Sequence, residues 1–254
     1  AEPDVRDCFA ELLGELGLVL HAGSKATAFE NGELTVETAY GAEQIAADKV
    51  IVAVGRKPNS DDLGLDLARV SPDNHGLLPV GADRRISDHI AAIGDITSGP
   101  ALAHKASAEA TVAAEALCGR KVAFQPAAIP AVVFSDPEVA SAGLTAADAN
   151  AEGIEVKTTN FPLSASGRAR TLNTANGFLQ IVSAADGDIV LGVHIVGPHA
   201  SDLIGEGVLA IEMGATLEDL ALSIHPHPTL SEQFLEAAHV GIGQPIHLAV
   251  LGKK

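Results

Sequence analysis

The sequence predicts parts of α/β nucleotide-binding domains in its first half, followed by an α+β domain with an antiparallel sheet. Apolar runs at 50–54 and 89–96 each reach a glycine, and such continuous runs are typical of parallel strands buried on both faces. After residue 122, a series of strand patterns precedes a series of helical patterns, the order expected of an α+β domain.

The first third of the chain is predicted to form one helix and several short strands. Apolar residues recur at helical spacing over 4–17, and Gly17 marks the end of that helix. Strands are predicted over 18–23, 25–30 and 34–39, and the Asn31-Gly32 pair predicts a hairpin turn between the last two.

The next segment brings two glycine sites to strand ends. The predicted strand 50–54 ends at Gly55, and the predicted strand 89–96 contains Gly94-Asp95 after a loop-rich stretch at 61–85. Ligands of open α/β sheets lie at the carboxyl ends of the strands, so both glycine sites are expected to face a ligand. A helix with a proline near its start is predicted over 99–119.

The second half is predicted to contain strands, then helices. Strands are expected at 129–136, 138–144, 154–162, 177–184 and 188–197, and helices at 145–153, 201–214 and 229–241, with an acidic turn at 216–223. The change of character near residue 122 places domain boundaries at 1–66, 67–121 and 122–254.

Charge excludes several classes of partner. The 254 residues include 16 Lys and Arg against 33 Asp and Glu, a formal net charge of −17. Nucleic-acid binding depends on cationic contacts to phosphate, so we expect no nucleic-acid partner, and an anionic membrane surface is equally disfavoured. No apolar run is long enough to span a membrane, and no secretory signal pattern is visible.

The two cysteines predict a cytoplasmic location. Cys8 and Cys118 are far apart and form no close pair, which favours reduced thiols over a disulfide.

A glycine motif at 205–210, GEGVLA, matches the dinucleotide fingerprint but lies inside a predicted helix instead of at a strand-to-helix turn. We therefore interpret its glycines as sites of close helix packing, and the chain has no credible phosphate-binding loop.

The segment HPHPTLSE, residues 225–232, is the most specific feature of the sequence. Its prolines restrict the backbone on both sides of His227, and His227-Pro228 is a candidate cis bond. An extended HPHP segment would point its two imidazoles to opposite sides, and no cysteine or carboxylate cluster completes a site, so we expect no metal.

Glu232 has two interpretations from spacing alone. Thr229 and Glu232 match a capping box at the start of a helix, in which the glutamate only caps the backbone. Alternatively, the Glu232 carboxylate orients the His227 imidazole and stabilises its protonated form, as a general base requires.

Asp95 also has two interpretations. Its carboxylate can accept hydrogen bonds from sugar or polyol hydroxyls, or it can cap a turn. The helix that starts near Leu102 directs backbone N–H groups toward whatever lies in front of it, which favours a ring with partial negative charge.

HPHPTLSE resembles the C-terminal active-site signature of the dihydrolipoamide dehydrogenase family, flavin disulfide oxidoreductases of 2-oxo acid dehydrogenase complexes. The segments AVGRKPN, AIGDI, GPALAHKA, SDPEVASAG, FPLSASGRA and GVHIVGP resemble other blocks of the family, in order. The resemblance runs from about residue 4 to residue 239.

The resemblance implies a role for individual residues. His227 would be the acid/base and Glu232 its orienting partner, and Asp95 would bind the ribityl chain of FAD. The residues implied to lie against the flavin are Ala101, Leu102, Ala103 and His104. The residues implied to touch NAD are Gly55 and Ala26. Residues 122–254 would form the interface domain of a homodimer, which delivers the histidine into the partner's active site. A lipoyl-bearing acyltransferase of a 2-oxo acid dehydrogenase complex is the implied protein partner.

The chain departs from the family pattern in what it lacks. The redox cysteine pair and the glycine loops for FAD and NAD are absent from it. We therefore expect the C-terminal part of a longer enzyme, inactive as an isolated chain. Alternatives are another flavin disulfide reductase, of the mercuric or glutathione reductase type, or a non-catalytic dimerisation fragment.

Overall fold

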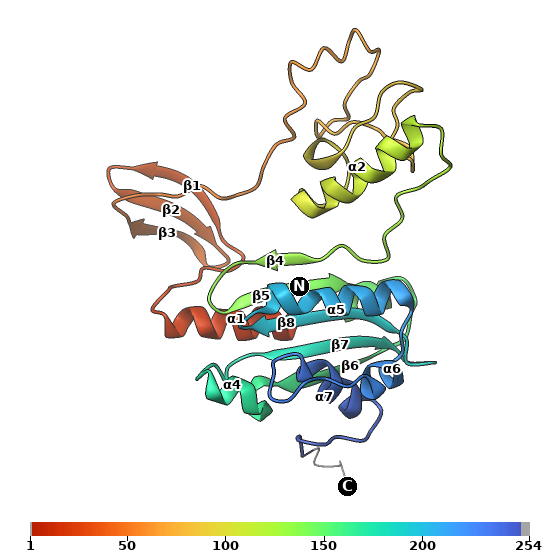
Figure 1. The fold of residues 1–254 in the computed structure, drawn as a ribbon. Coiled ribbons are helices and arrows are strands. Elements are labelled where there is room, and N and C mark those ends of the chain that lie inside the picture. Colours follow the sequence, from red (N-terminus) through yellow and green to blue (C-terminus); the bar gives the residue numbers. More distant parts are fainter. Residues whose placement is uncertain (1, 250–254) are drawn as a thin grey trace. The chain divides into compact units, whose positions relative to one another are not determined.

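The computed structural model describes residues 2–249 and divides the chain into two compact units (Figure 1). One unit combines the first 18 residues with the chain from Pro126 onward, and the other spans Val19–Gln125. The predicted boundaries at 66 and 121 describe domains of a longer protein, and they stay a prediction.

The larger unit is built on a five-stranded antiparallel sheet in the order β4-β5-β8-β7-β6. The strands are β4 (Ala131–Val133), β5 (Glu138–Gly143), β6 (Val156–Pro162), β7 (Phe178–Ala184) and β8 (Val190–Gly197). All five predicted strands and the antiparallel sheet are confirmed.

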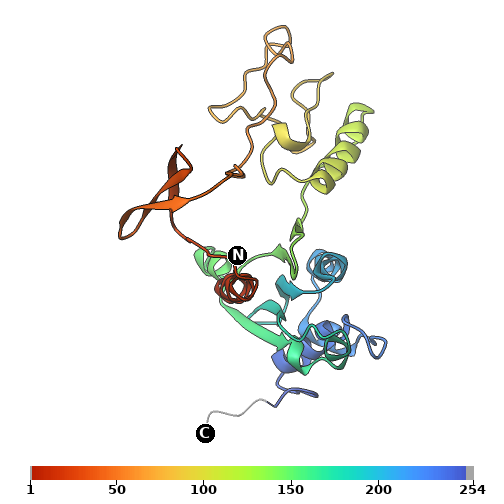
Figure 2. The same cartoon turned by 90° about the vertical axis from the view of Figure 1, so that its left-hand side faces the viewer.

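Helices cover both faces of this sheet (Figure 2). On one face lie α5 (Ala200–Met213), α6 (Leu217–Leu222) and α7 (Glu232–Gly241), and on the other lies α1 (Pro3–Glu15). Side chains alternate accordingly: Ala140 and Ile195 join the core beneath α5 and α7, whereas Val139 and Val196 pack with Val5 of α1. The helices predicted at 4–17, 201–214 and 229–241 are confirmed.

Short helices account for two differences from prediction. The predicted acidic turn at 216–223 is the helix α6, because Thr216 and Asp219 form a capping box that satisfies its first N–H groups. The helix α4 (Gly167–Thr171) was not predicted, and α3 (Ala146–Ala151) corresponds to the helix expected at 145–153.

The GEGVLA glycines lie within α5, as the packing interpretation required. A Cβ on Gly207 would stand 2.9 Å from the Val193 side chain of β8, whereas one on Gly205 would meet no atom within 4 Å. Gly207 therefore allows α5 to approach the sheet.

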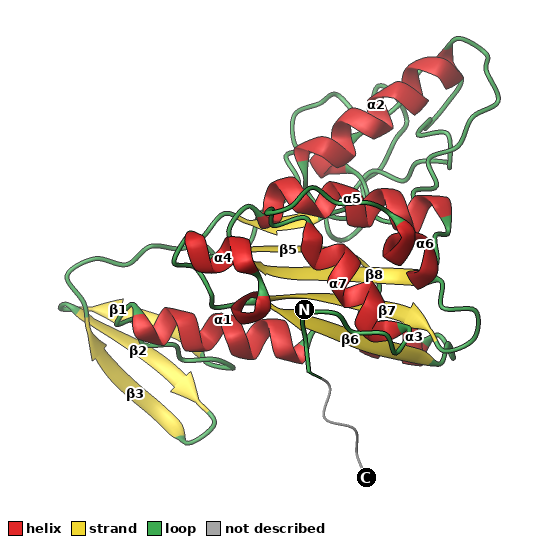
Figure 3. Cartoon of the chain, turned by 60° about the horizontal axis from the view of Figure 1, so that its bottom comes forward, coloured by secondary structure: helices red, strands yellow, loops and turns green. Residues whose placement is uncertain are grey.

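The smaller unit begins with a three-stranded antiparallel sheet, in which β2 (Glu33–Thr38) lies between β1 (Lys25–Glu30) and β3 (Gly41–Ala46) (Figure 3). The predicted hairpin turn is confirmed, since Asn31 and Gly32 both adopt positive φ, 51° and 81°. The strand β3 was not predicted.

A 3₁₀ turn and a long helix complete the smaller unit. The turn η1 (Gly94–Ile96) packs against α2 (Ala103–Leu117), which confirms the helix expected at 99–119.

Three predicted strands are wrong for this chain, namely 18–23, 50–54 and 89–96. None forms a strand, and only an isolated bridge joins Ala91 to Arg85. Ile51 and Val54 are each 91% exposed. A parallel strand needs neighbouring strands to satisfy its backbone, and no described strand lies beside 50–54. Within the described residues, no helix is long and apolar enough to cross a membrane.

Candidate functional site

The HPHP segment joins α6 to α7 and sends its two histidines to different partners. The His225 side chain is only 7% exposed, and its Nε2 lies 2.7 Å from Glu206 Oε1 of α5. His227 is 74% exposed, and its Nδ1 lies 2.8 Å from Glu232 Oε1. The predicted cis bond between His227 and Pro228 is confirmed.

The Glu232 carboxylate contacts both the His227 ring and the backbone, as its two interpretations require. Its Oε1 faces the His227 ring, and its Oε2 accepts a hydrogen bond from the Thr229 N–H at 2.7 Å. The Thr229 hydroxyl donates instead to the Pro226 carbonyl at 2.7 Å, so the reciprocal half of the capping box is not formed.

These contacts keep Glu232 ionised. Burial acts to raise the pKa of its carboxyl, but hydrogen bonds from Thr229 and His227 act the other way. Together with the charges of His227 and His247 they prevail, and the pKa lies below its ordinary value.

The geometry specifies which nitrogen of His227 is available for chemistry. A carboxylate only accepts hydrogen bonds, so Nδ1 carries the proton in the neutral ring and Nε2 holds the free lone pair. The pair can therefore take up a proton at Nε2 while Glu232 stabilises the resulting imidazolium.

A pocket of about 200 Å³ opens beside this pair, entirely within the larger unit. Its lining includes Phe161 of β6, Ser166 and Gly167 at the start of α4, and the pair His227 and Glu232. Glu236 and His247 also line it.

A second candidate site lies in the smaller unit. A pocket of about 600 Å³ brings together three predicted cofactor residues, Gly55, Asp95 and Ala101. Arg56 connects them: it forms an ion pair with Asp95 at 3.5 Å and donates a hydrogen bond to the Ala101 carbonyl at 3.0 Å.

The helix α2 begins at this pocket. Ala101 and Leu102 are half-buried, and Ala103 and His104 are exposed in its first turn. The N-cap residue, Leu102, makes no side-chain hydrogen bond to the first backbone N–H groups of the helix, where the positive end of the helix dipole lies. Ala26 lies in β1 and does not line this pocket.

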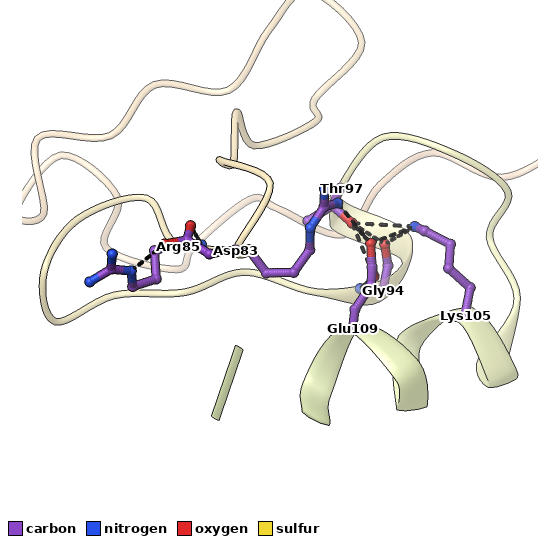
Figure 4. Close-up of polar contacts among 7 residues, drawn as sticks. Asp83, Arg85, Gly94, Thr97, Lys105 and Glu109 are labelled. Atoms are coloured by element: carbon purple, nitrogen blue, oxygen red, sulfur yellow. Dashed lines mark hydrogen bonds and ion pairs between the residues drawn. The ribbon is translucent and has the colours of Figure 1, made fainter. Parts of the chain in front are cut away.

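A buried charged cluster holds the Asp95 turn in place (Figure 4). Glu109 Oε2 accepts from the Gly94 N–H at 2.7 Å, and Lys105 Nζ donates to the Gly94 carbonyl at 3.1 Å. Arg84 pairs with Glu109 at 3.0 Å. Lys105 and Glu109 are almost fully buried, so the two peptide groups on either side of Gly94 are held by side chains one helical turn apart.

Sequence reasoning missed this cluster and the Glu236–His247 pair. A signal for the cluster was present, because Lys105 and Glu109 are spaced by four residues in a helix otherwise rich in alanine. Among residues 2–249, no group of three or more His, Cys, Asp or Glu side chains is arranged to hold a metal ion.

Two family comparisons match most of the chain. Residues 129–238 match the family described as "Pyridine nucleotide-disulphide oxidoreductase, dimerisation domain", and residues 1–110 match "Pyridine nucleotide-disulphide oxidoreductase".

Curated relatives of high identity are named dihydrolipoyl dehydrogenase. The protein of Geobacillus stearothermophilus is 51% identical over 216 residues, covering 85% of this chain and 46% of the relative. That of Haloferax volcanii is 46% identical over 254 residues, covering 97% of this chain and 53% of the relative. The chain thus spans about half the length of the curated relatives it matches.

Solved structures share the fold. LpdA from Mycobacterium tuberculosis matches with a TM-score of 0.83 at 26% identity, covering 94% of this chain and 53% of LpdA. The HOCl-induced flavoprotein disulfide reductase RclA from Escherichia coli matches with a TM-score of 0.82 at 22% identity, covering 94% of this chain and 56% of RclA. These matches extend across both units and support the predicted fold class, including its nucleotide-binding part.

Proposed function

The chain belongs to the pyridine nucleotide-disulphide oxidoreductase family, and from this premise we propose that it is the C-terminal half of an FAD- and NAD-dependent dihydrolipoamide dehydrogenase. The observation that carries the proposal is the His227–Glu232 pair. The Glu232 carboxylate holds Nδ1 of His227, which leaves Nε2 to accept a proton. The curated relatives at 46–51% identity, which are named dihydrolipoyl dehydrogenase, support the proposal.

His227 is the proposed acid/base for a dithiol substrate. A thiol attacks a disulfide only as its thiolate, so the reaction needs a group that accepts the thiol proton. His227 Nε2 accepts that proton, and the ionised Glu232 stabilises the imidazolium. The disulfide that receives the attack is not supplied by Cys8 and Cys118, which are both free.

The smaller unit suits FAD by the chemistry of its donors and acceptors. The half-exposed Asp95 carboxylate is an acceptor for ribityl hydroxyls. The uncapped start of α2, with Ala101, Leu102, Ala103 and His104, suits the partial negative charge of a flavin ring. When bound, FAD would supply the electron transfer between the disulfide and NAD. Gly55 and Ala26 are the proposed contacts to NAD.

The proposed assembly is a homodimer. Residues 129–238 match a dimerisation domain, and the 74% exposed His227 is available to face a partner subunit. A lipoyl-bearing acyltransferase of a 2-oxo acid dehydrogenase complex is the proposed further partner, and the proposed location is the cytoplasm.

A His227→Gln substitution in the full-length enzyme tests this function. We expect dihydrolipoamide-to-NAD turnover to fall by about 100- to 10,000-fold, because glutamine cannot take up the proton. The flavin absorbance should stay at its wild-type level, since His227 lies in the larger unit and the proposed FAD residues lie in the smaller one. Turnover within a few-fold of wild type would remove His227 from the acid/base role.

An assay of the isolated chain tests whether the rest of the enzyme is required, and turnover by the chain alone would contradict the proposal that it is only the C-terminal half. We expect no turnover from the chain alone with added FAD, because it carries no redox cysteine pair.

A further inference from the structure

A second histidine–carboxylate pair lines the same pocket as His227 and Glu232. Glu236 Oε1 lies 2.6 Å from His247 Nδ1, and Glu236 Oε2 accepts from the His247 backbone N–H at 3.3 Å. The first pair is arranged in the same way: one oxygen of Glu232 binds the imidazole and the other binds a backbone N–H. The two glutamates are four residues apart on α7, so they lie on one face of that helix.

The burial of Glu236 makes this contact more than a surface ion pair. Its side chain is 6% exposed, whereas the His247 ring is 64% exposed. A buried carboxylate is costly unless it is paired and hydrogen-bonded, so Glu236 holds His247 in position. The hydrogen bond and charge of Glu236 in turn raise the pKa of His247, which favours the imidazolium.

We propose that Glu236 and His247 are positioning residues for the His227 site: their contact fixes the segment after α7 as one wall of the pocket and holds the His247 imidazole in the pocket lining beside Glu232. This proposal rests on the function proposed above. It assigns a role to the segment around His247, which lies beyond the residues matched by the dimerisation-domain family.

The charge of His247 has a definite effect on the first pair. Four titratable side chains line the pocket, His227, Glu232, Glu236 and His247, and the lining residues from β6 and the turn before α4 are uncharged. The imidazolium of His247 attracts the Glu232 carboxylate and so acts to lower the pKa of that carboxyl. Loss of that charge raises the pKa of the Glu232 carboxyl back toward its ordinary value, so the carboxylate that orients His227 loses its charge at a higher pH.

The test is the pH profile of turnover of the full-length holoenzyme with His247→Gln. We expect the acid limb to move to higher pH by about half a unit at low salt, with less movement at high salt. His247→Lys, which keeps a positive charge, should leave the acid limb of the pH profile close to its wild-type position. A His247→Gln profile that overlays the wild type at low salt would overturn the proposal.

The anchoring of the segment after α7 can be tested by a measurement that does not depend on activity. Glu236→Gln should speed amide hydrogen exchange over residues 242–249 by about ten-fold or more, because the carboxylate that holds His247 is gone. Asp202→Asn is the matched control, since Asp202 pairs with His199 at 3.4 Å on an exposed part of α5 outside the pocket. It should change neither exchange over 242–249 nor the pH profile. Unchanged exchange in Glu236→Gln would refute the anchoring role.

These outcomes are distinguishable from failure of the proposed function. If His227→Gln abolishes turnover but His247→Gln leaves the profile unchanged, only the second pair has been misassigned. If His227→Gln turns over normally, the acid/base assignment itself is wrong, while the exchange measurement on Glu236→Gln still tests the anchor.

Discussion

At the scale of single residues, the chemistry rests on how carboxylate oxygens are divided between partners. Glu232 uses one oxygen to orient His227 and the other to bind the Thr229 N–H. Capping and orientation are therefore not competing interpretations, because a carboxylate has an acceptor for each. The backbone contact fixes the carboxylate, and the fixed carboxylate fixes the ring.

Glu232→Gln tests this at the level of stability. The pKa of Glu232 is lowered in the folded chain, so its contribution is present above the ordinary value of 4.5 and is lost as pH falls through the lower folded value. We expect the wild type to be more stable than the variant by about 1–2 kcal/mol at pH 7. The gap should narrow as pH falls below 4.5, and thermal melts between pH 3 and 8 would measure it. A gap that is constant across this range would contradict the assignment of a charged Glu232.

At the scale of elements, the larger unit follows its local sequence closely. Its strands are covered on both faces, so short apolar segments such as the one with Val139 and Ala140 were a sufficient signal. The helix α4 was missed because its five residues, GRART, are too few to show a helical period.

The two glycines of GEGVLA offer a matched test of close packing. Gly207→Ala should destabilise the protein by about 1–3 kcal/mol, since the added Cβ would press on Val193. Gly205→Ala on the same helix should be neutral or stabilising by up to about 1 kcal/mol, because the site is open and alanine favours the helix. Denaturant midpoints of both variants would show this contrast, and equal effects at both positions would argue against the packing role of Gly207.

At the scale of the whole molecule, the chain matches about half of each relative, and its smaller unit contains apolar segments without strand partners. Ile51, Val52 and Val54 are largely exposed in the run that precedes Gly55. A run of this composition suits a strand buried on both faces, so the partners of 50–54 are expected in the remainder of the full-length enzyme.

Amide hydrogen exchange over 50–54 tests that expectation. In the full-length enzyme these amides should exchange far more slowly than in this chain alone, because paired strands hydrogen-bond their N–H groups. Residues 34–38 of β2 provide the internal control, since β2 is paired on both sides within the chain. Equally fast exchange of 50–54 in both proteins would show that this run is not a strand in the full enzyme.

The sequence by itself determined the antiparallel sheet, the long helices, the hairpin at Asn31-Gly32 and the HPHPTLSE segment as the place of the candidate site. Each of these depends on local periodicity, turn chemistry or a short motif, which neighbouring residues specify. Only the tertiary structure decided that Glu232 serves two partners, that Lys105 and Glu109 hold the Asp95 turn, and that His247 reaches the His227 pocket. It also decided that 50–54 is not a strand here. Such features depend on what lies beside a residue in space, and a strand or a buried charge exists only when its partner is present.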